Sequence, residues 1–178
     1  MKWYNEPPSW EEKDGAIIVH SAPTTDFWRK THYGFIRDTG HFYGQPISGD
    51  FVAEVKITGE YRTLYDQAGL MVRLDEVCWL KCGIEYVGGV QHVSAVVTRD
   101  FSDWCIIPLP QHPPALWMRV TRRGEAVEIH YSLDGVVYTM LRLAHFCLAE
   151  QVQVGIMSAS PEGNGFKATF TGFDVREL

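Results

Sequence analysis

A short segment of the chain carries three side chains that could together bind a polar ligand with an apolar side. Trp79 offers an aromatic ring, Lys81 a cation and Glu85 a carboxyl group, and all three stand at odd-numbered positions. Because successive side chains of a strand point to opposite faces, all three would share one face if the segment is extended. The mixture of an aromatic ring with charged groups is typical of a small-molecule site.

Three consecutive antiparallel strands would position these residues: Gln67 to Arg73, Trp79 to Val87 and Gln91 to Arg99. Each is rich in the β-branched and aromatic residues that fit a pleated sheet. Gly88 and Gly89 accept the positive φ angles of a tight turn between the second and third strands.

The register of the first two strands follows from the length of the turn between them. A five-residue turn from Leu74 to Cys78 places Arg73 opposite Trp79 and Gln67 opposite Glu85. A turn shorter by one residue would bury Arg73 without a partner, so we reject it. The accepted register predicts one outward face with the following members: Gln67, Met71, Arg73, Trp79, Lys81, Glu85, His92, Ser94 and Thr98. Such a face could also be an ordinary solvated surface, because antiparallel sheets commonly leave one face in water.

Predicted loops could form walls around this face, and their candidate residues are His32, Asp66, Arg99, Asp103 and Trp104. Either aspartate could instead cap a turn. The aromatic-rich segment from Thr25 to Tyr43 has no clean period. We expect it to be a packed loop that covers one end of the core, or alternatively a rim for the outward face.

Catalytic signals are few. Glycoside hydrolysis normally requires two carboxyl groups about 5 to 9.5 Å apart, and the outward face supplies only Glu85. Asp66 or Asp26 would be its partner only if a loop folds inward. Metalloprotease, hydrolase and nucleotide-binding motifs are missing, and the histidines have no metal-site spacing. We therefore expect no metal and no cofactor.

Composition limits the class of protein. The chain has 178 residues with 46% hydrophobic residues, which predicts a single domain over residues 1–178. A formal net charge of -6 without a basic run argues against binding to nucleic acid. No apolar stretch is long enough to span a bilayer and no leader is evident, so we expect a soluble, cytoplasmic protein with no membrane partner. Its four cysteines are expected to be reduced.

The rest of the chain also has the pattern of strands. Phe51 to Ile57 alternates cleanly between apolar and charged residues. The other predicted strands are Ala16 to His20, Trp117 to Arg122, Ala126 to Ser132, Val136 to Leu143, Val152 to Ala159 and Phe166 to Val175. About ten or eleven short strands with regular turns and no amphipathic helix indicate an all-β, antiparallel β-sandwich.

Several long strings carry a resemblance to a known family. They are TDFWRKTHYGFIRDTGHFY, YDQAGLMVRLDE, WLKCGIEYVGG, VVTRDFSDW, YSLDG and GIMSASPEGNGF. Nearly the whole chain resembles the family called domain of unknown function 1349, also described as regulation-of-enolase-like proteins. The resemblance implies a concanavalin A-like jelly roll, whose concave sheet face holds carbohydrate in lectins and glucanases of that fold. The E-x-D-x-x-E signature of the glucanases is missing here.

Because a fold does not fix a function, three hypotheses remain. The first is a binding module for carbohydrate or sugar phosphate, in which Trp79 stacks on a sugar ring. Its predicted ligand-binding residues are His32, Asp66, Gln67, Arg73, Trp79, Lys81, Glu85, Ser94, Thr98 and Trp104. The second is a sugar-active enzyme, a glycoside hydrolase, with Glu85 as general acid or base and His32 or Asp66 as the second group. The third is a protein-interaction or regulatory module of carbohydrate metabolism, with a protein partner.

Overall fold

The chain folds entirely into strands and their connections. A computed structural model describes residues 1–178 and contains sixteen strands. They are β1 (Lys2–Tyr4), β2 (Ser9–Lys13), β3 (Ala16–His20), β4 (Phe27–Arg29), β5 (Ile36–Asp38), β6 (His41–Ser48), β7 (Phe51–Gly59), β8 (Gln67–Arg73), β9 (Cys78–Val87), β10 (Val90–Arg99), β11 (Phe101–Leu109), β12 (Leu116–Arg123), β13 (Ala126–Ser132), β14 (Thr139–His145), β15 (Gln151–Ala159) and β16 (Lys167–Glu177).

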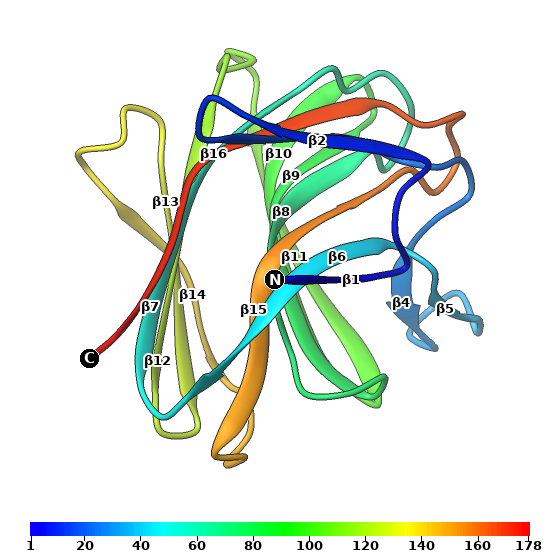
Figure 1. Ribbon diagram of the computed structural model, residues 1–178. Helices are drawn as coiled ribbons and strands as arrows, with labels where there is room; N and C mark the ends of the chain where they lie inside the picture. Colours follow the sequence, from blue (N-terminus) through cyan, green and yellow to red (C-terminus); the bar gives the residue numbers. More distant parts are fainter.

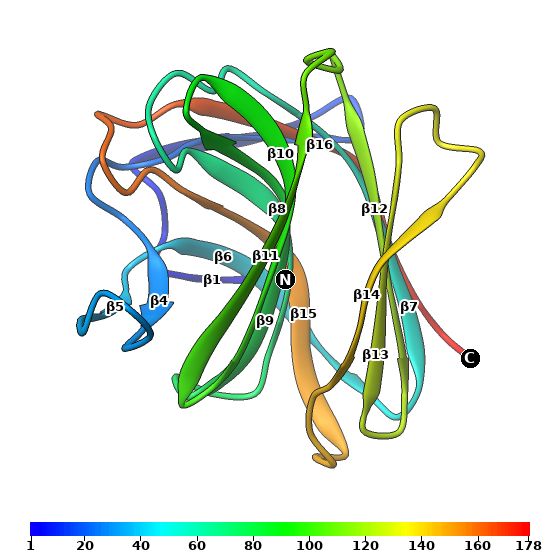
Figure 2. The same cartoon turned by 180° about the vertical axis from the view of Figure 1, so that it is seen from behind.

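Two seven-stranded antiparallel sheets form the sandwich. The first has the order β1-β6-β15-β8-β9-β10-β11 and the second the order β14-β13-β12-β7-β16-β3-β2. Figures 1 and 2 show the two sheets facing each other, with the small β4–β5 hairpin on the far side of the first sheet. The all-β, antiparallel sandwich predicted from the strand pattern is therefore confirmed. The structure has no helix of the length and hydropathy that a membrane-spanning segment needs.

The predicted register of the central strands is also confirmed. Arg73 pairs with Trp79 and Gln67 with Glu85 across β8 and β9. His92 on β10 lies opposite Glu85, because Val87 pairs with Val90 across the glycine turn. The side-chain period of two thus separates an inner face from an outer face along all three strands.

The inner faces of both sheets enclose the main hydrophobic core of 27 buried residues. The alternating residues of β7 belong to it, and Phe51, Ala53 and Val55 are at most 2% exposed. Ile84 of β9 lies in the same core at 3% exposure.

The outer face of the first sheet is covered rather than solvated, which corrects the expectation of an open face. The β4–β5 hairpin lies over it, and a second cluster of eight buried residues fills the space between them. Its members are Phe27, Trp28, Phe42, Met71, Trp79, Val96, Met157 and Ala159. The segment from Thr25 to Gly40 therefore covers the outer face, not one end of the main core. Residues 41–43, the end of the aromatic-rich segment, instead begin strand β6.

Two other segments differ from the sequence-based expectation. The residues after Asp100 were expected to form a loop. They form β11 instead, and the whole of β11 pairs with β10, for example Trp104 with Val96. The strand expected from Val136 begins only at Thr139, because the carboxylate of Asp134 accepts the backbone N–H groups of Val136 and Val137 in a turn. Short strands such as β1 and β5 raise the total above the expected ten or eleven.

Candidate ligand-binding site

A pocket of about 90 Å³ remains between the hairpin and the first sheet. Its floor comes from β8 and β9, and its walls come from the hairpin, the loop before β8, β11 and the loop before β16. The lining residues are Asp26, Trp28, Tyr33, Phe35, Arg37, Tyr65, Gln67, Lys81, Glu85, Trp104, Pro161 and Glu162. The covering hairpin thus converts an open sheet face into a small pocket.

Glu85 is a buried carboxyl group with one oxygen that accepts no hydrogen bond from the protein. Oε2 accepts hydrogen bonds from Ser94 Oγ at 2.7 Å and from Trp104 Nε1 at 2.8 Å. Oε1 accepts none, and the residue is 7% exposed and lines the pocket. Oε1 is therefore the atom of Glu85 that could accept a hydrogen bond from a ligand.

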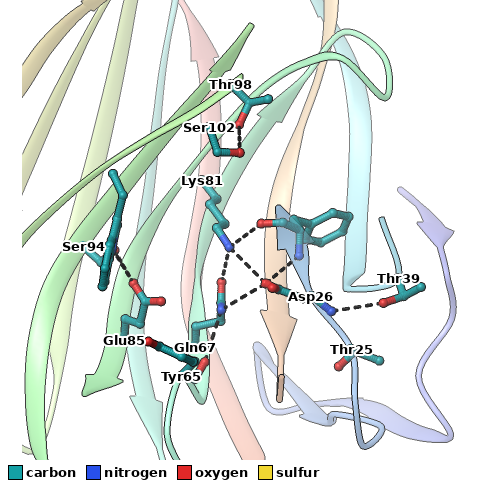
Figure 3. A network of polar contacts seen from close by, with 12 residues as sticks. Thr25, Asp26, Thr39, Tyr65, Gln67, Lys81, Glu85, Ser94, Thr98 and Ser102 are labelled. Carbon is teal, nitrogen blue, oxygen red and sulfur yellow. Dashed lines mark hydrogen bonds and ion pairs between the residues drawn. The ribbon is translucent and has the colours of Figure 1, made fainter. Parts of the chain in front are cut away.

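Lys81 anchors the hairpin to the sheet. Its Nζ donates to Gln67 Oε1 at 2.6 Å and to the backbone oxygen of Phe27 at 2.7 Å, and it lies 3.4 Å from Asp26 Oδ1. Figure 3 shows Lys81, Gln67 and Asp26 pointing toward one another. The three donors of the ammonium group have three acceptors, so its charge is already compensated.

Asp26 enters the same pocket from the hairpin. Besides Lys81, its Oδ1 accepts the backbone N–H of Phe27 at 2.8 Å and faces Gln67 Nε2 at 3.5 Å. Its Oδ2 has no hydrogen-bond partner within the protein. Besides the exposed Glu162, the pocket therefore contains two buried carboxyl groups, Asp26 and Glu85, and each has one oxygen that accepts no hydrogen bond from the protein.

Four aromatic rings form a closed frame around the pocket. Trp28 meets Tyr33 edge-on at 5.6 Å and Trp104 edge-on at 6.5 Å, measured between ring centroids. Tyr65 meets Trp104 edge-on at 6.3 Å, and the hydroxyl groups of Tyr33 and Tyr65 lie 3.3 Å apart. We call these four residues the aromatic frame.

The backbone at Tyr65 is strained to place its ring in the frame. Its φ of 67° lies in the left-handed region, which is unfavourable for a bulky aromatic residue. The conformation is held by a hydrogen bond of 2.7 Å from its backbone N–H to the oxygen of Tyr86. Strain of this kind accumulates at binding sites, where the surroundings fix an unusual geometry.

The pocket changes the acidity of its groups. Burial raises the pKa of Glu85, and this effect outweighs the opposing influence of Lys81 and of the hydrogen bonds from Ser94 and Trp104. The hydrogen bond with Tyr33, together with burial, raises the pKa of Tyr65 to about 12. Glu85 therefore accepts a proton at a higher pH than an exposed glutamate, whereas Tyr65 stays neutral.

The structure brings together only part of the predicted ligand-binding set. Gln67, Lys81, Glu85 and Trp104 line the pocket. Ser94 lies behind them and hydrogen-bonds Glu85. Trp104 reaches the pocket from β11 and not from the expected loop.

The other predicted ligand-binding residues pack against, or hydrogen-bond to, other residues of the protein. Trp79 is 1% exposed beneath the hairpin, so its ring has no face available for a sugar. Thr98, also fully buried, contacts Ser102 Oγ at 2.9 Å.

Arg73, Asp66 and His32 likewise lie outside the pocket lining. Arg73 forms a two-pronged ion pair with Asp38 of β5, at 2.9 and 2.7 Å. The carboxylate of Asp66 accepts hydrogen bonds from Ser160 Oγ and from two backbone N–H groups of the preceding turn. His32 is exposed in the hairpin turn and packs edge-on against Tyr33.

Sequence reasoning missed most of the pocket walls. Asp26 was considered only as a partner carboxylate. The lining residues outside the predicted set are Trp28, Tyr33, Phe35, Arg37, Tyr65, Pro161 and Glu162. The density of aromatic residues between Thr25 and Tyr43 was a signal for the missed residues of the hairpin, and the sequence offered none for Tyr65, Pro161 and Glu162. No group of three or more histidine, cysteine, aspartate or glutamate side chains is arranged to hold a metal ion.

The fold and the pocket together define an antiparallel β-sandwich of the jelly-roll class with a small pocket on its first sheet. The same fold occurs in the carbohydrate binding module CBM66 from Bacillus subtilis, with a TM-score of 0.65 and 13% identity over 98% of this chain and 95% of that one. At this level of identity the likeness concerns the fold alone.

The chain belongs to the family described as "Protein of unknown function (DUF1349)", whose profile matches residues 3–178. It is 40% identical to "Regulation of enolase protein 1" of Saccharomyces cerevisiae over 173 residues, which cover 97% of this chain and 87% of the relative. A crystal structure of a functionally unknown protein from Saccharomyces cerevisiae has a TM-score of 0.95 and 38% identity, and the match covers 99% of this chain and 96% of that one. The resemblance inferred from the sequence strings is thus confirmed.

Proposed function

We propose that the pocket beneath the hairpin binds a small carbohydrate or sugar derivative. One observation carries the proposal: the aromatic frame lines the same pocket as Asp26 and Glu85, each of which has a carboxyl oxygen without a hydrogen bond to the protein. Sugar rings present apolar C–H faces that pack on aromatic rings and hydroxyl groups that donate to carboxylate oxygens. The site therefore supplies both kinds of contact that a sugar requires.

The size of the pocket indicates how such a ligand would enter. With a cavity volume of about 90 Å³, the pocket is small. Only one substituent or one edge of a sugar ring would lie inside. The remainder would lie at the mouth, where Tyr33 and Phe35 are stacked and exposed and Arg37 lies over the Phe35 ring.

A thermal-shift screen of monosaccharides, sugar phosphates and amino sugars would identify a ligand, and calorimetry would then measure its affinity. We expect saturable binding that Trp28→Ala and Glu85→Gln each weaken at least tenfold, because one contributes to the aromatic frame and the other offers the free oxygen. Trp117→Ala and Glu128→Gln are matched controls, since both residues lie on the second sheet away from the pocket. Binding that survives both pocket substitutions would refute the proposal.

A sugar-active enzyme would need a second carboxyl group beside Glu85, and Asp26 and Glu162 both line the same pocket. Both oxygens of Asp66 are occupied within the protein, whereas Asp26 and Glu85 line the same pocket. Hydrolysis of nitrophenyl glycosides by the wild type, lost in both Asp26→Asn and Glu85→Gln, would assign a reaction. Turnover that persists in Glu85→Gln would remove its role as general acid or base.

A second candidate function is regulation of another protein, which the name of the yeast relative favours. Its test is direct addition of this chain to purified enolase, followed by size-exclusion chromatography and an activity assay. A complex of defined stoichiometry with altered enolase activity would support it. If the two proteins form no complex and the rate of the enolase reaction does not change, a direct action on enolase is excluded.

A further inference from the structure

We propose that the ligand of this pocket carries a positively charged nitrogen, as in an amino sugar or another primary or quaternary amine, and that this nitrogen lies within the aromatic frame above Glu85. The inference rests on the proposed function for the location of the site, and it adds the charge and chemical class of the ligand. Two features of the pocket carry it: the geometry of the rings and the distribution of charge.

The rings are arranged for a cation. Trp28 and Trp104 meet at an interplanar angle of 88°, Trp28 and Tyr33 at 72°, and Tyr65 and Trp104 at 76°. Near-perpendicular rings cannot all stack on one flat sugar face. They can surround a compact group, and the electron-rich faces of tryptophan and tyrosine attract a cation within about 6 Å of the ring centre.

The charges in the pocket leave one buried carboxyl group without a counter-ion. Lys81 lies 3.4 Å from Asp26, so the hairpin carboxylate and the sheet cation offset each other. Glu85 forms no ion pair, and its only hydrogen-bond donors are the neutral groups of Ser94 and Trp104. At the mouth, Arg37 and Glu162 bring one charge of each sign. A cationic ligand would therefore supply the missing partner of Glu85.

The size of the pocket agrees with this assignment. The pocket is small, at about 90 Å³, and an ammonium group with its attached carbons needs less room than a whole sugar ring. Tyr33 and Tyr65, the remaining titratable groups facing the pocket, hydrogen-bond each other through their hydroxyl groups and provide no positive charge.

Protons compete with such a ligand for Glu85. Because burial raises the pKa of this carboxyl group, it is neutral at low pH and gains its charge at a higher pH than an exposed glutamate does. Affinity for a permanently charged amine should consequently rise as the pH increases through that raised pKa. Tetramethylammonium is a suitable probe because its own charge does not titrate.

The experiment compares matched probes by calorimetry on the full chain: glucosamine, N-acetylglucosamine, glucose and tetramethylammonium. We expect glucosamine to bind about tenfold more tightly than its two neutral analogues, and tetramethylammonium to bind measurably. Both effects should be lost in Glu85→Gln and kept in the control Glu128→Gln. Circular dichroism would verify that both variants fold.

The outcomes separate this inference from the proposed function. Equal binding of glucose and glucosamine would overturn the charge preference and leave sugar binding intact. Binding of tetramethylammonium alone, abolished in Glu85→Gln, would support the cation site and refute the sugar. Absence of binding by all four probes would overturn the inference, and so would a cation preference that persists in Glu85→Gln.

Discussion

Trp104 donates its indole hydrogen to Glu85 Oε2 over 2.8 Å, although the two residues lie on strands separated by a third. Ser94 of the intervening strand β10 contacts both, at 2.7 Å from Glu85 Oε2 and 3.1 Å from Trp104 Nε1. Because both donors reach the same oxygen, Oε1 is left free for a ligand. Three strands thus orient one carboxyl group from one side only.

Glu85 should make the stability of the protein depend on pH. Its folded-state pKa is raised above the usual 4.5 by burial, so the folded state binds the proton more tightly than the unfolded state does. The contribution of Glu85 is most favourable below pH 4.5 and is lost as the pH rises through the folded-state pKa. A tenfold difference in proton affinity between the two states corresponds to about 1.4 kcal/mol of stability.

Urea unfolding of the wild type and of Glu85→Gln at pH 4 and pH 7.5 would measure this dependence. The wild type should lose stability relative to the variant as the pH increases, because glutamine stays neutral throughout. A difference between the two proteins that is constant with pH would contradict the raised pKa. Because Glu85 is buried at 7% exposure, this substitution is not the neutral surface change that the outward face predicted from the sequence would imply.

Truncation of Ile84 should destabilise the main core. Ile84 is 3% exposed between the two sheets, and the substitution Ile84→Ala should cost about 2 to 5 kcal/mol through lost burial and the cavity left behind. Ile36→Ala is the matched control, since Ile36 is 52% exposed in the hairpin. Denaturant midpoints at an unchanged m-value measure both. A larger loss for Ile36→Ala would contradict the assigned faces.

Lys81→Met should release the hairpin from the sheet. The substitution removes the donor to Phe27 and leaves the carboxylate of Asp26 buried without a counter-ion. Removing one partner of a buried ion pair typically lowers the stability of a protein by about 3 to 5 kcal/mol. The double variant Lys81→Met with Asp26→Asn should lose less than the sum of the single changes, as a double-mutant cycle would show. The exposed Lys2 provides the control Lys2→Met.

Arg73→Lys should weaken the attachment of β5 although the charge is kept. The guanidinium group donates two hydrogen bonds to Asp38 and lies 4.4 Å from the centre of the Tyr4 ring. A lysine ammonium cannot form the same planar pair, and charged hydrogen bonds of this kind contribute about 1.5 to 3 kcal/mol.

The control for Arg73→Lys is Arg176→Lys, whose side chain is 51% exposed. Surface ion pairs contribute little, so this change should stay within about 0.5 kcal/mol. Chemical unfolding would measure both variants, and an equal effect would show that the buried pair between Arg73 and Asp38 contributes no more than a surface pair.

The sequence predicted the features that depend on short-range pattern. The pairing of Arg73 with Trp79 follows from the period of two and the length of one turn. The burial of Ile84 follows from the same parity. Both require only neighbouring strands, whose side chains alternate in a fixed way.

The features that depend on distant segments could not be predicted in this way. Trp79 and Glu85 were assigned to an open face because nothing within their strands shows that residues 25–40 cover them. The aromatic frame combines Trp28, Tyr65 and Trp104 from three separate parts of the chain. Trp104 in particular was placed in a loop, since the charged and aromatic residues after Asp100 hide the alternation of β11.

The β4–β5 hairpin forms a two-stranded sheet of its own and shares no strand pairing with either large sheet. Its internal hydrogen bonds, such as that from the Lys30 N–H to the Phe35 oxygen, can break without disturbing β8 or β9. The hairpin amides should therefore exchange with deuterium through local opening, whereas those of β8 and β9 should require global unfolding. A bound ligand would slow exchange in the hairpin, which makes this segment a built-in reporter of occupancy for any compound under trial.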